Sequence, residues 1–356
     1  MKIGILGAGQ LAQLLAHSAY MMGMETLCFS ETQDAPAARN SPLCIGNLHD
    51  QALLDQFAAQ CDVVTLENEN IDVQVMQALQ SKVAVYPQAK AIEKAQDRWL
   101  EKQLFQELSI PTPEFFPVNS LDDLQHAVQK LGLPAVLKTR RFGYDGKGQA
   151  MLRKPADLVQ AWEALGGVPL ILEQYIPFEA EVSMIAARSV SGAVAFYPLH
   201  KNTHANGILR MTESPYLNSS LQNQAEIQIQ HIFSALDYVG VLVIEYFIYN
   251  NTLIANEMAP RVHNSGHGTI EGYQMSQFEM HLRAIVDLPL ITPQLQHPTW
   301  MYNFIGVMPH LEPDDYRDAH VYVYGKSPRP GRKLGHMTSF EHKRALYQLI
   351  QSGSPD

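Results

Sequence analysis

Short apolar runs alternate with helix-like segments over residues 1–95, and this alternation constrains the fold more than any other feature of the chain. The apolar runs have the length of buried strands and lie at 2–6, 25–30, 62–66 and 83–86. The segments between them have the apolar spacing of helices and lie at 10–22, 50–60 and 72–80. Strands that alternate with helices form βαβ units, whose strands pair in parallel. We therefore predict an α/β domain with a doubly wound parallel sheet over residues 1–95.

The rest of the chain has the patterns of α+β domains. A helix at 96–108 ends at two prolines, and short strands at 135–138, 149–152 and 170–173 then surround helices at 120–131 and 155–165. Longer β segments follow at 181–190, 193–199, 208–212, 241–249 and 252–257, with helices at 221–236 and 274–286. We predict that these longer segments form a mostly antiparallel sheet. A tail from about residue 300 adds strands near 301–306 and 319–324, a basic turn and a last helix.

Length and charge limit the class of protein. A chain of 356 residues exceeds one ordinary core, so two or three domains are expected. The net charge of −10 argues against a general nucleic-acid binder or a protein of anionic membranes, because both partners attract a basic surface. Three cysteines without CxxC spacing are typical of reduced thiols, and no signal peptide or membrane-spanning run is evident. We therefore expect a cytoplasmic protein with small-molecule partners, and no nucleic-acid or membrane partner.

A glycine-rich turn follows the first predicted strand, where Gly7 and Gly9 precede Gln10 and Leu11. Such a turn lets a phosphate approach the N–H groups at a helix N-terminus. Glu31 ends the second predicted strand, where dinucleotide-binding folds keep the acid that binds ribose. On this motif alone, a NAD-binding domain is the leading interpretation. The same turn binds other phosphates, or only packs tightly, in many unrelated proteins.

A second glycine-rich loop is more informative. Lys138 ends a predicted strand, and the following loop, 143–149, contains three glycines around an aspartate and a lysine. A plain hairpin needs only one glycine. The composition therefore indicates a mobile flap whose N–H groups close over phosphates. A flexible basic hairpin tip is the alternative.

Acidic residues follow three of the predicted strands. Glu173 ends the strand near 170, and Glu181 lies shortly after it, so the strand edge could face a purine and the second carboxylate a ribose diol. An ordinary acidic loop is the alternative there. Glu245 interrupts an apolar strand and Glu257, beside Asn256, ends the next one, so the two carboxylates should lie on adjacent strands. Two buried carboxylates with an amide suit Mg²⁺ better than zinc, whereas the alternative is a structural ion pair with an arginine, Arg261.

Taken in order, these motifs resemble those of N5-carboxyaminoimidazole ribonucleotide synthetases, a family of ATP-grasp enzymes. The resemblance lies in the opening turn at 7–11, the segment 67–70, the flap at 143–148, the metal segment at 256–267 and the late segment at 329–336. It covers nearly the whole chain, and the order of the motifs is more specific than any one of them. It implies an ATP-grasp fold whose parts are an N-terminal doubly wound domain over 1–95, a small lid domain over 96–180, a large domain with the metal site over 181–300 and a β-rich C-terminal subdomain over 301–356.

The resemblance also implies a reaction. The enzyme would convert 5-aminoimidazole ribonucleotide, bicarbonate and ATP to N5-carboxyaminoimidazole ribonucleotide, ADP and phosphate in purine synthesis, through carboxyphosphate. It would use Mg²⁺, as one or two ions, with Mn²⁺ as an alternative, and its subunits would form a homodimer. The flap would exclude water, because carboxyphosphate hydrolyses readily. Arg261 would grip the planar carbonate, and Asp145 would position or deprotonate the amine.

Individual roles follow from the resemblance. Residues that contact ATP would be Arg98, Lys138, Gly143, Tyr144, Asp145, Gly146, Lys147, Gly148, Gln149, Glu173, Gln174, Tyr175, Ile176, Glu181, His204, Asn256 and Glu257. Residues that bind the aminoimidazole substrate would be Gln10, Leu11, Glu67, Tyr144, Asp145, Lys326, Arg332 and Lys333, of which the last three would take its 5′-phosphate. The metal would be held by Glu245 and Glu257. Catalysis would involve Lys138, Asp145 and Arg261.

Two positions depart from the wider ATP-grasp pattern. Ala259 stands where many relatives have a metal-binding Asn, and Arg98 stands where many have Lys, so no third protein ligand for the metal is named. His263 and His267 would indicate zinc only with helical context and a third ligand. Three rival functions share part of the pattern: a formate-using glycinamide ribonucleotide transformylase, a dehydrogenase and a non-catalytic nucleotide-binding protein. A dehydrogenase would have no use for the flap and the two-carboxylate site.

Overall fold

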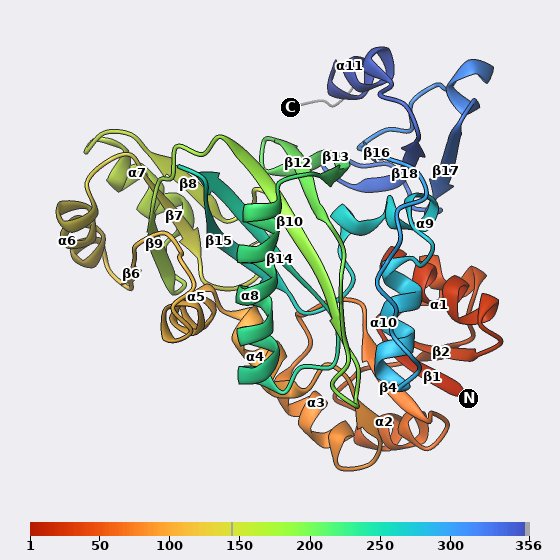
Figure 1. The fold of residues 1–356 in the computed structure, drawn as a ribbon. Coiled ribbons are helices and arrows are strands. Elements are labelled where there is room, and N and C mark those ends of the chain that lie inside the picture. Colours follow the sequence, from red (N-terminus) through yellow and green to blue (C-terminus); the bar gives the residue numbers. More distant parts are fainter. Residues whose placement is uncertain (144, 353–356) are drawn as a thin grey trace.

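The computed structural model describes residues 1–143 and 145–352, which form three sheets with helices around them (Figure 1). The N-terminal sheet is parallel and has the order β3-β2-β1-β4-β5. Its strands are β1 (Lys2–Leu6), β2 (Glu25–Ser30), β3 (Leu43–Ile45), β4 (Val63–Leu66) and β5 (Ala84–Val85). Its helices are α1 (Gln10–Met21), α2 (Gln51–Ala58) and α3 (Val73–Gln80), with a short 3₁₀ helix, η1 (Pro36–Arg39). The predicted parallel α/β fold is confirmed, and only the three-residue edge strand β3 was missed.

Two helices, not one, connect this domain to the next. The chain forms α4 (Ala89–Gln96) and then α5 (Arg98–Glu107); the helix expected at 96–108 is α5, and α4 was missed. Asp97 adopts an extended conformation between them, and its side chain accepts a hydrogen bond from the Trp99 N–H at 2.9 Å. An aspartate that caps a helix in this way ends the preceding helix, because it cannot remain helical itself. Arg98 is thereby placed at the first turn of α5.

The small domain has a four-stranded sheet with the order β6-β9-β7-β8. The strands are β6 (Phe115–Val118), β7 (Ala135–Thr139), β8 (Gln149–Leu152) and β9 (Leu170–Gln174), and the helices are α6 (Leu121–Leu131) and α7 (Asp157–Leu165). Strand β6 was missed because Pro117 interrupts its pattern. A proline is tolerated there because β6 lies at the edge of the sheet, where one side of the strand needs no partner.

The large sheet is antiparallel throughout, with the order β15-β14-β10-β12-β13-β16-β18-β17, and β11 (Val194–Phe196) pairs beside β10. Its other strands are β10 (Ala180–Arg188), β12 (Leu199–Ala205), β13 (Ile208–Tyr216), β14 (Gly240–Tyr249), β15 (Thr252–Ala259), β16 (Thr299–Ile305), β17 (Ala319–Val323) and β18 (Lys333–Ser339). The single strand expected at 193–199 is split at Pro198 into β11 and the start of β12. Strand β18 was missed because its first residues were assigned to the basic turn.

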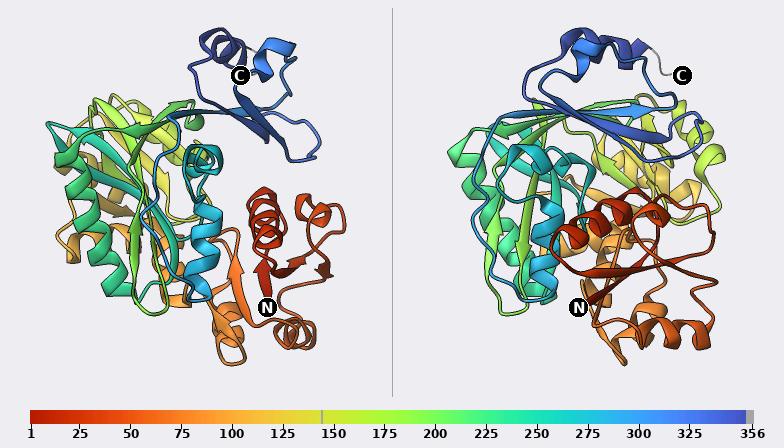
Figure 2. Two further views of the ribbon diagram at one scale, coloured as in Figure 1. Left: turned by 45° about the vertical axis from the view of Figure 1, so that its right-hand side comes forward. Right: turned by 90° about the vertical axis from the view of Figure 1, so that its right-hand side faces the viewer.

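The strands of the expected β-rich C-terminal tail continue the large sheet. Helix α8 (Ser219–Leu236) covers one side of this sheet, and α10 (Gln277–Ile285) stands between the sheet and the N-terminal domain (Figure 2). One hydrophobic core therefore joins residues of β1, α1, β10, β14 and α10. The remaining helices are α9 (Thr269–Gly272), α11 (Arg344–Ser352), η2 (Asn264–Gly266) and η3 (Pro313–Tyr316). Within the described residues, every helix is too short or too polar to cross a membrane.

Candidate active site

The small and large sheets enclose a cavity of about 240 Å³. Most of the residues expected to bind ATP line it: Arg98, Lys138, Asp145, Gly146, Lys147, Gln149, Glu173, Gln174, Tyr175, Ile176, Glu181, His204, Asn256 and Glu257. Glu245 also lines this cavity, whereas Gly143 lines a neighbouring one and Tyr144 lies outside the described residues. Apolar side chains that were not singled out from the sequence complete the wall: Val136, Met151, Phe178 and Phe247. A flat aromatic ring could bind against such a surface.

Lys138 and Glu173 form a buried pair at the back of this cavity. The Lys138 Nζ lies 2.8 Å from Glu173 Oε2 and donates to Asn256 Oδ1 at 3.4 Å. Burial alone would raise the pKa of Glu173, but the charges of Lys102 and Lys138 lower it to about 2. The other carboxylate oxygen, Oε1, is buried without a hydrogen-bond partner. It is therefore an acceptor that a ligand amine could satisfy.

The glycine flap closes against the turn between β12 and β13. Gly146 has φ +76°, and a Cβ atom at this position would lie 2.5 Å from the Asn206 carbonyl oxygen. Gly207, on the turn itself, has φ +73°, and a Cβ there would lie 2.4 Å from the Cα of Gly146. Gly148 has φ +72° and packs against Thr139. Glycine is thus required in the flap both for backbone conformation and for a close approach.

A cationic histidine lies on the large-sheet wall. His204 on β12 contacts Glu181 on β10, with Nδ1 2.9 Å from Oε2. Burial would lower the pKa of His204, but the hydrogen bond to Glu181 and the charges of Glu245 and Glu257 raise it to about 9. The imidazole is therefore a cation at neutral pH and could face an anion.

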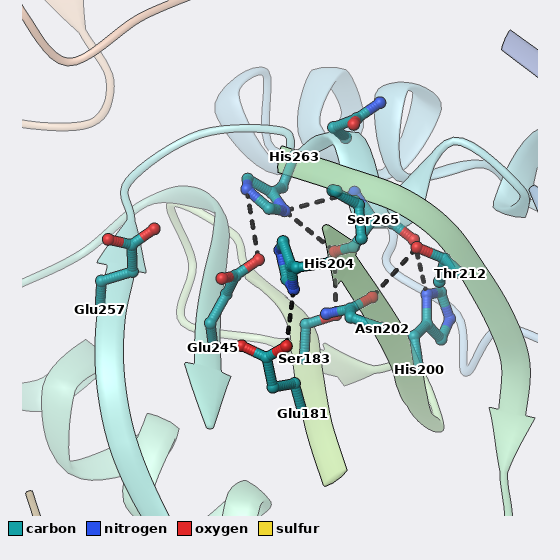
Figure 3. A network of polar contacts seen from close by, with 12 residues as sticks. Glu181, Ser183, His200, Asn202, His204, Thr212, Glu245, Glu257, His263 and Ser265 are labelled. Carbon is teal, nitrogen blue, oxygen red and sulfur yellow. Dashed lines mark hydrogen bonds and ion pairs between the residues drawn. The ribbon is translucent and has the colours of Figure 1, made fainter. Parts of the chain in front are cut away.

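Glu245 and Glu257 lie directly opposite each other on β14 and β15, as the sequence predicted (Figure 3). The Arg98 Nη1 lies 2.9 Å from Glu257 Oε2, and His263 Nε2 lies 3.7 Å from Glu245 Oε1. The alternative ion pair with Arg261 does not form. Desolvation, together with the charge of Glu257, raises the pKa of Glu245 to about 7, whereas the Arg98 charge lowers the pKa of Glu257 to about 2.

These residues fit a hard divalent cation. Both carboxylates line the first cavity with the Asn256 amide, and these are oxygen donors of the kind that Mg²⁺ prefers. Among the described residues, no third His, Cys, Asp or Glu joins them to form a cluster that could hold a metal. The donor set thus leaves positions for phosphate oxygens and water, and it does not fit a closed zinc site. His267, the other half of the histidine pair, instead lies against His336 with ring centroids 4.7 Å apart.

A second cavity, of about 290 Å³, lies between the N-terminal domain and the end of β15. Gln10, Leu11, Glu69, Arg261 and Lys333 line it. Three side chains line both this cavity and the first one: Arg98, Asp145 and Glu257. The two cavities therefore meet at these three side chains.

Glu67 occupies the N-terminus of α1 that the glycine-rich turn exposes. Its carboxylate accepts from the Gly9 N–H at 2.5 Å and from the Ala12 N–H at 3.1 Å. A Cβ atom on Gly7 or Gly9 would lie within 2.7 Å of the Glu67 side chain. Burial raises the pKa of Glu67. The position at which a dinucleotide fold binds pyrophosphate is thus filled by this protein's own carboxylate, which argues against a NAD-binding site.

Arg261 lies in the second cavity and is engaged by Glu69. Its Nε and Nη2 both donate to the Glu69 carboxylate, the latter at 3.0 Å. Its Nη1 donates to the Val262 carbonyl at 3.1 Å. A carbonate bound bidentately by Arg261 would have to replace the Glu69 oxygens.

The three cations expected around the 5′-phosphate separate into two places. Lys326 and Arg332 line a polar cavity of about 240 Å³ beside η1, together with Arg39 and Ser327. Burial, and the nearby charge of Arg332, lower the pKa of Lys326 to about 8, and its Nζ donates to Gln10. Lys333 instead faces the second cavity, where its Nζ lies 2.6 Å from Asp145 Oδ1.

Sequence reasoning missed several polar residues of the site. Arg39 is the last residue of the short helix η1, and Glu69 lies in a loop, in the segment 67–70 that carried the resemblance but without a role of its own. Glu101 and Lys102 are buried on α5, in contact with the end of β15. A signal did exist for Glu101, because the helical spacing places it on the same face as Leu104 and Phe105. A charged residue on an apolar helix face needs a partner.

The chain is similar to known proteins over nearly its whole length. Residues 1–96 match the ribonucleotide synthetase preATP-grasp domain, residues 103–278 the ATP-grasp domain and residues 299–348 the phosphoribosylaminoimidazole carboxylase C-terminal domain. The chain is 46% identical to an N5-carboxyaminoimidazole ribonucleotide synthase of Pseudomonas aeruginosa over 98% of its length and 97% of that protein's. It superposes on the N5-carboxyaminoimidazole ribonucleotide synthetase of Thermus thermophilus with a TM-score of 0.91 and 44% identity, covering 98% of this chain and 96% of that one.

A further solved structure contains ligands. It is the N5-carboxyaminoimidazole synthase of Aspergillus clavatus in complex with ADP and 5-aminoimidazole ribonucleotide, at 28% identity and a TM-score of 0.90, covering 99% of this chain and 98% of that one. Both the fold and the family inferred from the sequence motifs are confirmed by these similarities. The chain belongs to the N5-carboxyaminoimidazole ribonucleotide synthase family of ATP-grasp ligases.

Proposed function

We propose that this protein carboxylates the exocyclic amine of 5-aminoimidazole ribonucleotide, using ATP and bicarbonate, and releases N5-carboxyaminoimidazole ribonucleotide, ADP and phosphate. One observation carries the proposal: Arg98, Asp145 and Glu257 line both cavities. We call the first cavity the nucleotide cavity and the second the acceptor cavity. A γ-phosphoryl group at the inner end of the nucleotide cavity would therefore face the acceptor cavity. This is the geometry that a phosphorylated intermediate needs in order to pass from one substrate to the other without leaving the protein.

Bicarbonate must first become an electrophile. Its oxygen attacks the γ-phosphorus, the bond to ADP breaks, and carboxyphosphate forms. Lys138 and Arg98 lie where they could offset charge on the moving phosphoryl group, and the flap N–H groups could do the same from the opposite side. Mg²⁺ held by Glu245 and Glu257, as one or two ions, would shield the phosphate charge, with Mn²⁺ as an alternative. Lys138 also forms an ion pair with Glu173, and Arg98 forms one with Glu257.

The carbonate part would bind at Arg261. Because Glu69 holds both donors of the guanidinium fork, we expect bicarbonate to enter by exchanging with that carboxylate. The exchange would connect binding to a movement of the loop after β4. Arg261 lines only the acceptor cavity, so the carbonate would lie on the acceptor side of Glu257.

Asp145 would position the amine or accept its proton. Its carboxylate lines both cavities, and Lys333 lies 2.6 Å away. The amine nitrogen attacks the carbonyl carbon, phosphate leaves, and Asp145 could accept the proton that the amine loses. Gln10 and Leu11 belong to the wall of the same cavity, whereas Glu67, which was also expected to bind the aminoimidazole, does not line it and instead caps the N-terminus of α1.

The ribose 5′-phosphate would bind at the polar cavity beside η1. Lys326 and Arg332, two of the three cations that the resemblance assigned to this phosphate, line it, and Arg39 adds another cation. Lys333 would act near the amine, because it pairs with Asp145. Glu173 and the backbone through Ile176 would bind adenine, and Glu181 the ribose, with His204 nearby. The proposal also includes the expected division into four domains, a homodimer and a cytoplasmic location.

The test is to measure ADP release with defined acceptor pairs. 5-Aminoimidazole ribonucleotide with bicarbonate should give rapid release, and formate with glycinamide ribonucleotide should give only the background rate. Omission of bicarbonate is the control for uncoupled ATP hydrolysis. Rapid release with the formate pair instead would identify a transformylase with the same ATP site.

A further inference from the structure

Strand β15 contains a β-bulge at Asn256, in the middle of the proposed site. Glu245 of β14 pairs with Glu257, but the next residue of β14, Tyr246, pairs with Ala255, so Asn256 has no partner in this ladder. Consecutive side chains of a regular strand point to opposite faces of the sheet. Asn256 and Glu257 nevertheless both line the nucleotide cavity. The bulge brings the two side chains to the same face, as bulges beside active sites do.

Lys102 of α5 holds the backbone of this bulge. Its Nζ donates to the Asn256 carbonyl at 2.6 Å and to the Ala255 carbonyl at 3.1 Å. It also donates to Thr112 Oγ1 at 3.0 Å, and the Thr112 hydroxyl in turn donates to the same Ala255 carbonyl at 2.8 Å. All three donors of the ammonium are therefore used on the bulge and on the residue that supports it.

Glu101, the preceding residue of α5, holds the other side of the bulge. Its Oε1 accepts a hydrogen bond from the Met258 N–H at 2.6 Å. The two side chains thus fix the backbone on both sides of Glu257: Lys102 binds the carbonyl groups before it, and Glu101 binds the amide after it. The same helix begins with Arg98, whose guanidinium pairs with the Glu257 carboxylate.

Both side chains are expensive to bury. Glu101 is 2% exposed and Lys102 is fully buried, and burial raises the pKa of the first and lowers that of the second. Neither is needed to fill the core, because Leu104 and Phe105 of the same helix supply apolar contacts there. Lys102 also lies 3.7 Å from Glu173, whose closer partner is Lys138 at 2.8 Å. A buried charged pair that contacts a distorted strand indicates a specific structural task.

We infer that Glu101 and Lys102 are positioning residues that hold the β15 bulge, so that Asn256 and Glu257 face the nucleotide and its metal together. Neither residue lies among those assigned to ATP, substrate or metal. The inference rests on the proposed function for the identity of the ligands. It assigns the task of arranging the metal-binding strand to the helix that connects the N-terminal and small domains.

The test uses two readouts, because loss of activity alone would not separate positioning from folding. Isothermal titration with a non-hydrolysable ATP analogue measures affinity with and without Mg²⁺, and steady-state kinetics measures kcat. In Lys102→Met, we expect the Mg²⁺-dependent gain in affinity to disappear while the Mg²⁺-free affinity stays within about threefold. A displacement of the metal ligands by about 1 Å should lower kcat on the order of 10²-fold.

Glu101 provides a pair of variants that remains informative if Lys102→Met does not fold. Glu101→Gln keeps an oxygen that can accept from Met258 and should retain the Mg²⁺ effect, whereas Glu101→Leu removes the acceptor and should lose it. Leu104→Ala on the same helix is the control: it should lower Tm without changing the Mg²⁺ effect.

An unchanged Mg²⁺ effect in folded Glu101→Leu protein would overturn the inference, as would an equal loss in Leu104→Ala. Failure of the proposed function can be distinguished from either result. In that case the wild-type protein would release no ADP with 5-aminoimidazole ribonucleotide and bicarbonate, while the titrations would still report on the bulge.

Discussion

Two charged neighbours affect Glu257 in opposite ways. Arg98 pairs with its carboxylate, whereas the carboxylate of Glu245 faces it across the strand pair. The pKa of Glu257 stays near 2, so this carboxylate is ionised throughout the neutral range. Burial first, and then the charge of Glu257, raise the pKa of Glu245 to about 7, so ionisation of this second carboxylate would be favoured by a further cation. Bound Mg²⁺ would supply that cation.

We predict that Glu257→Gln lowers kcat on the order of 10²-fold or more, because an amide is a poor ligand for a metal that shields phosphoryl charge. The variant should stay folded, since its side chain is 38% exposed to the cavity. Kinetics at increasing Mg²⁺ concentration measures the effect. Exposed Glu163→Gln, the same chemical change on α7, is the control. A near-normal kcat at saturating Mg²⁺ would contradict the metal assignment.

A second prediction concerns the separation of Lys326 and Arg332, which lie beside η1, from Lys333. Lys326→Ala and Arg332→Ala should each raise KM for 5-aminoimidazole ribonucleotide by roughly 10- to 150-fold, the loss of one charge-assisted contact of about 1.5–3 kcal/mol. KM for ATP should change little, because neither residue lines the nucleotide cavity. Lys333→Ala should instead lower kcat, because Lys333 pairs with Asp145.

Arg329→Ala is the matched control for these variants. Arg329 belongs to the same loop and is exposed, but it does not line the cavity that contains Lys326 and Arg332. Its KM values should stay near those of the wild type. If Lys326→Ala and Arg332→Ala weakened ATP binding and left the ribonucleotide unaffected, the two ends of the cleft would be assigned in reverse.

Among the elements, the flap depends most on its glycines. Gly146 lies against the β12–β13 turn, so a larger residue would prevent this contact. We predict that Gly146→Val raises the amount of ADP formed per carboxylated product, because an open flap admits water to carboxyphosphate. Gly132→Val, at a positive φ with no heavy atom within 4 Å of its Cβ, controls for backbone strain alone. One ADP per product in Gly146→Val would show that the flap does not protect the intermediate.

The sequence predicted most elements, and its errors have physical reasons. Strands with clear apolar runs, such as β1, β2 and β8, matched the expected residues. Strand β6 and the split between β11 and β12 were missed at prolines, whose effect depends on whether the strand lies at a sheet edge. The helix expected at 96–108 is α5, whereas α4, which ends just before the Asp97 cap, was missed, because such a cap depends on local geometry that a periodic pattern does not report.

The site was predictable where a motif is contiguous, as in the flap and at Asn256–Glu257. It was not predictable where residues from distant segments meet. Three such contacts join residues more than 50 positions apart. They are the pairing of Arg261 with Glu69, the capping of α1 by Glu67 and the hydrogen bond of Lys102 to the β15 bulge. Such contacts are set by the docking of whole domains, which no local pattern encodes.

For the whole molecule, the arrangement of domains creates the reaction chamber. The N-terminal domain shares a core with the large sheet through α10, and the C-terminal strands extend that sheet beside η1 (Figure 2). The acceptor cavity therefore has walls from both the N-terminal domain and the ATP-grasp part, and it opens onto the nucleotide cavity at Glu257. We propose that a phosphoryl group passes from ATP in the nucleotide cavity to the carbonate in the acceptor cavity.

Oxygen labelling tests this transfer of the phosphoryl group to bicarbonate. The protein would be given ATP, 5-aminoimidazole ribonucleotide and bicarbonate labelled with ¹⁸O, and the released phosphate would be analysed by mass spectrometry. If bicarbonate attacks the γ-phosphorus, its oxygen stays on phosphorus when the amine displaces phosphate. We therefore predict one ¹⁸O atom in each phosphate released with carboxylated product. Unlabelled phosphate, formed together with N5-carboxyaminoimidazole ribonucleotide, would contradict a carboxyphosphate intermediate and with it the transfer between the two cavities.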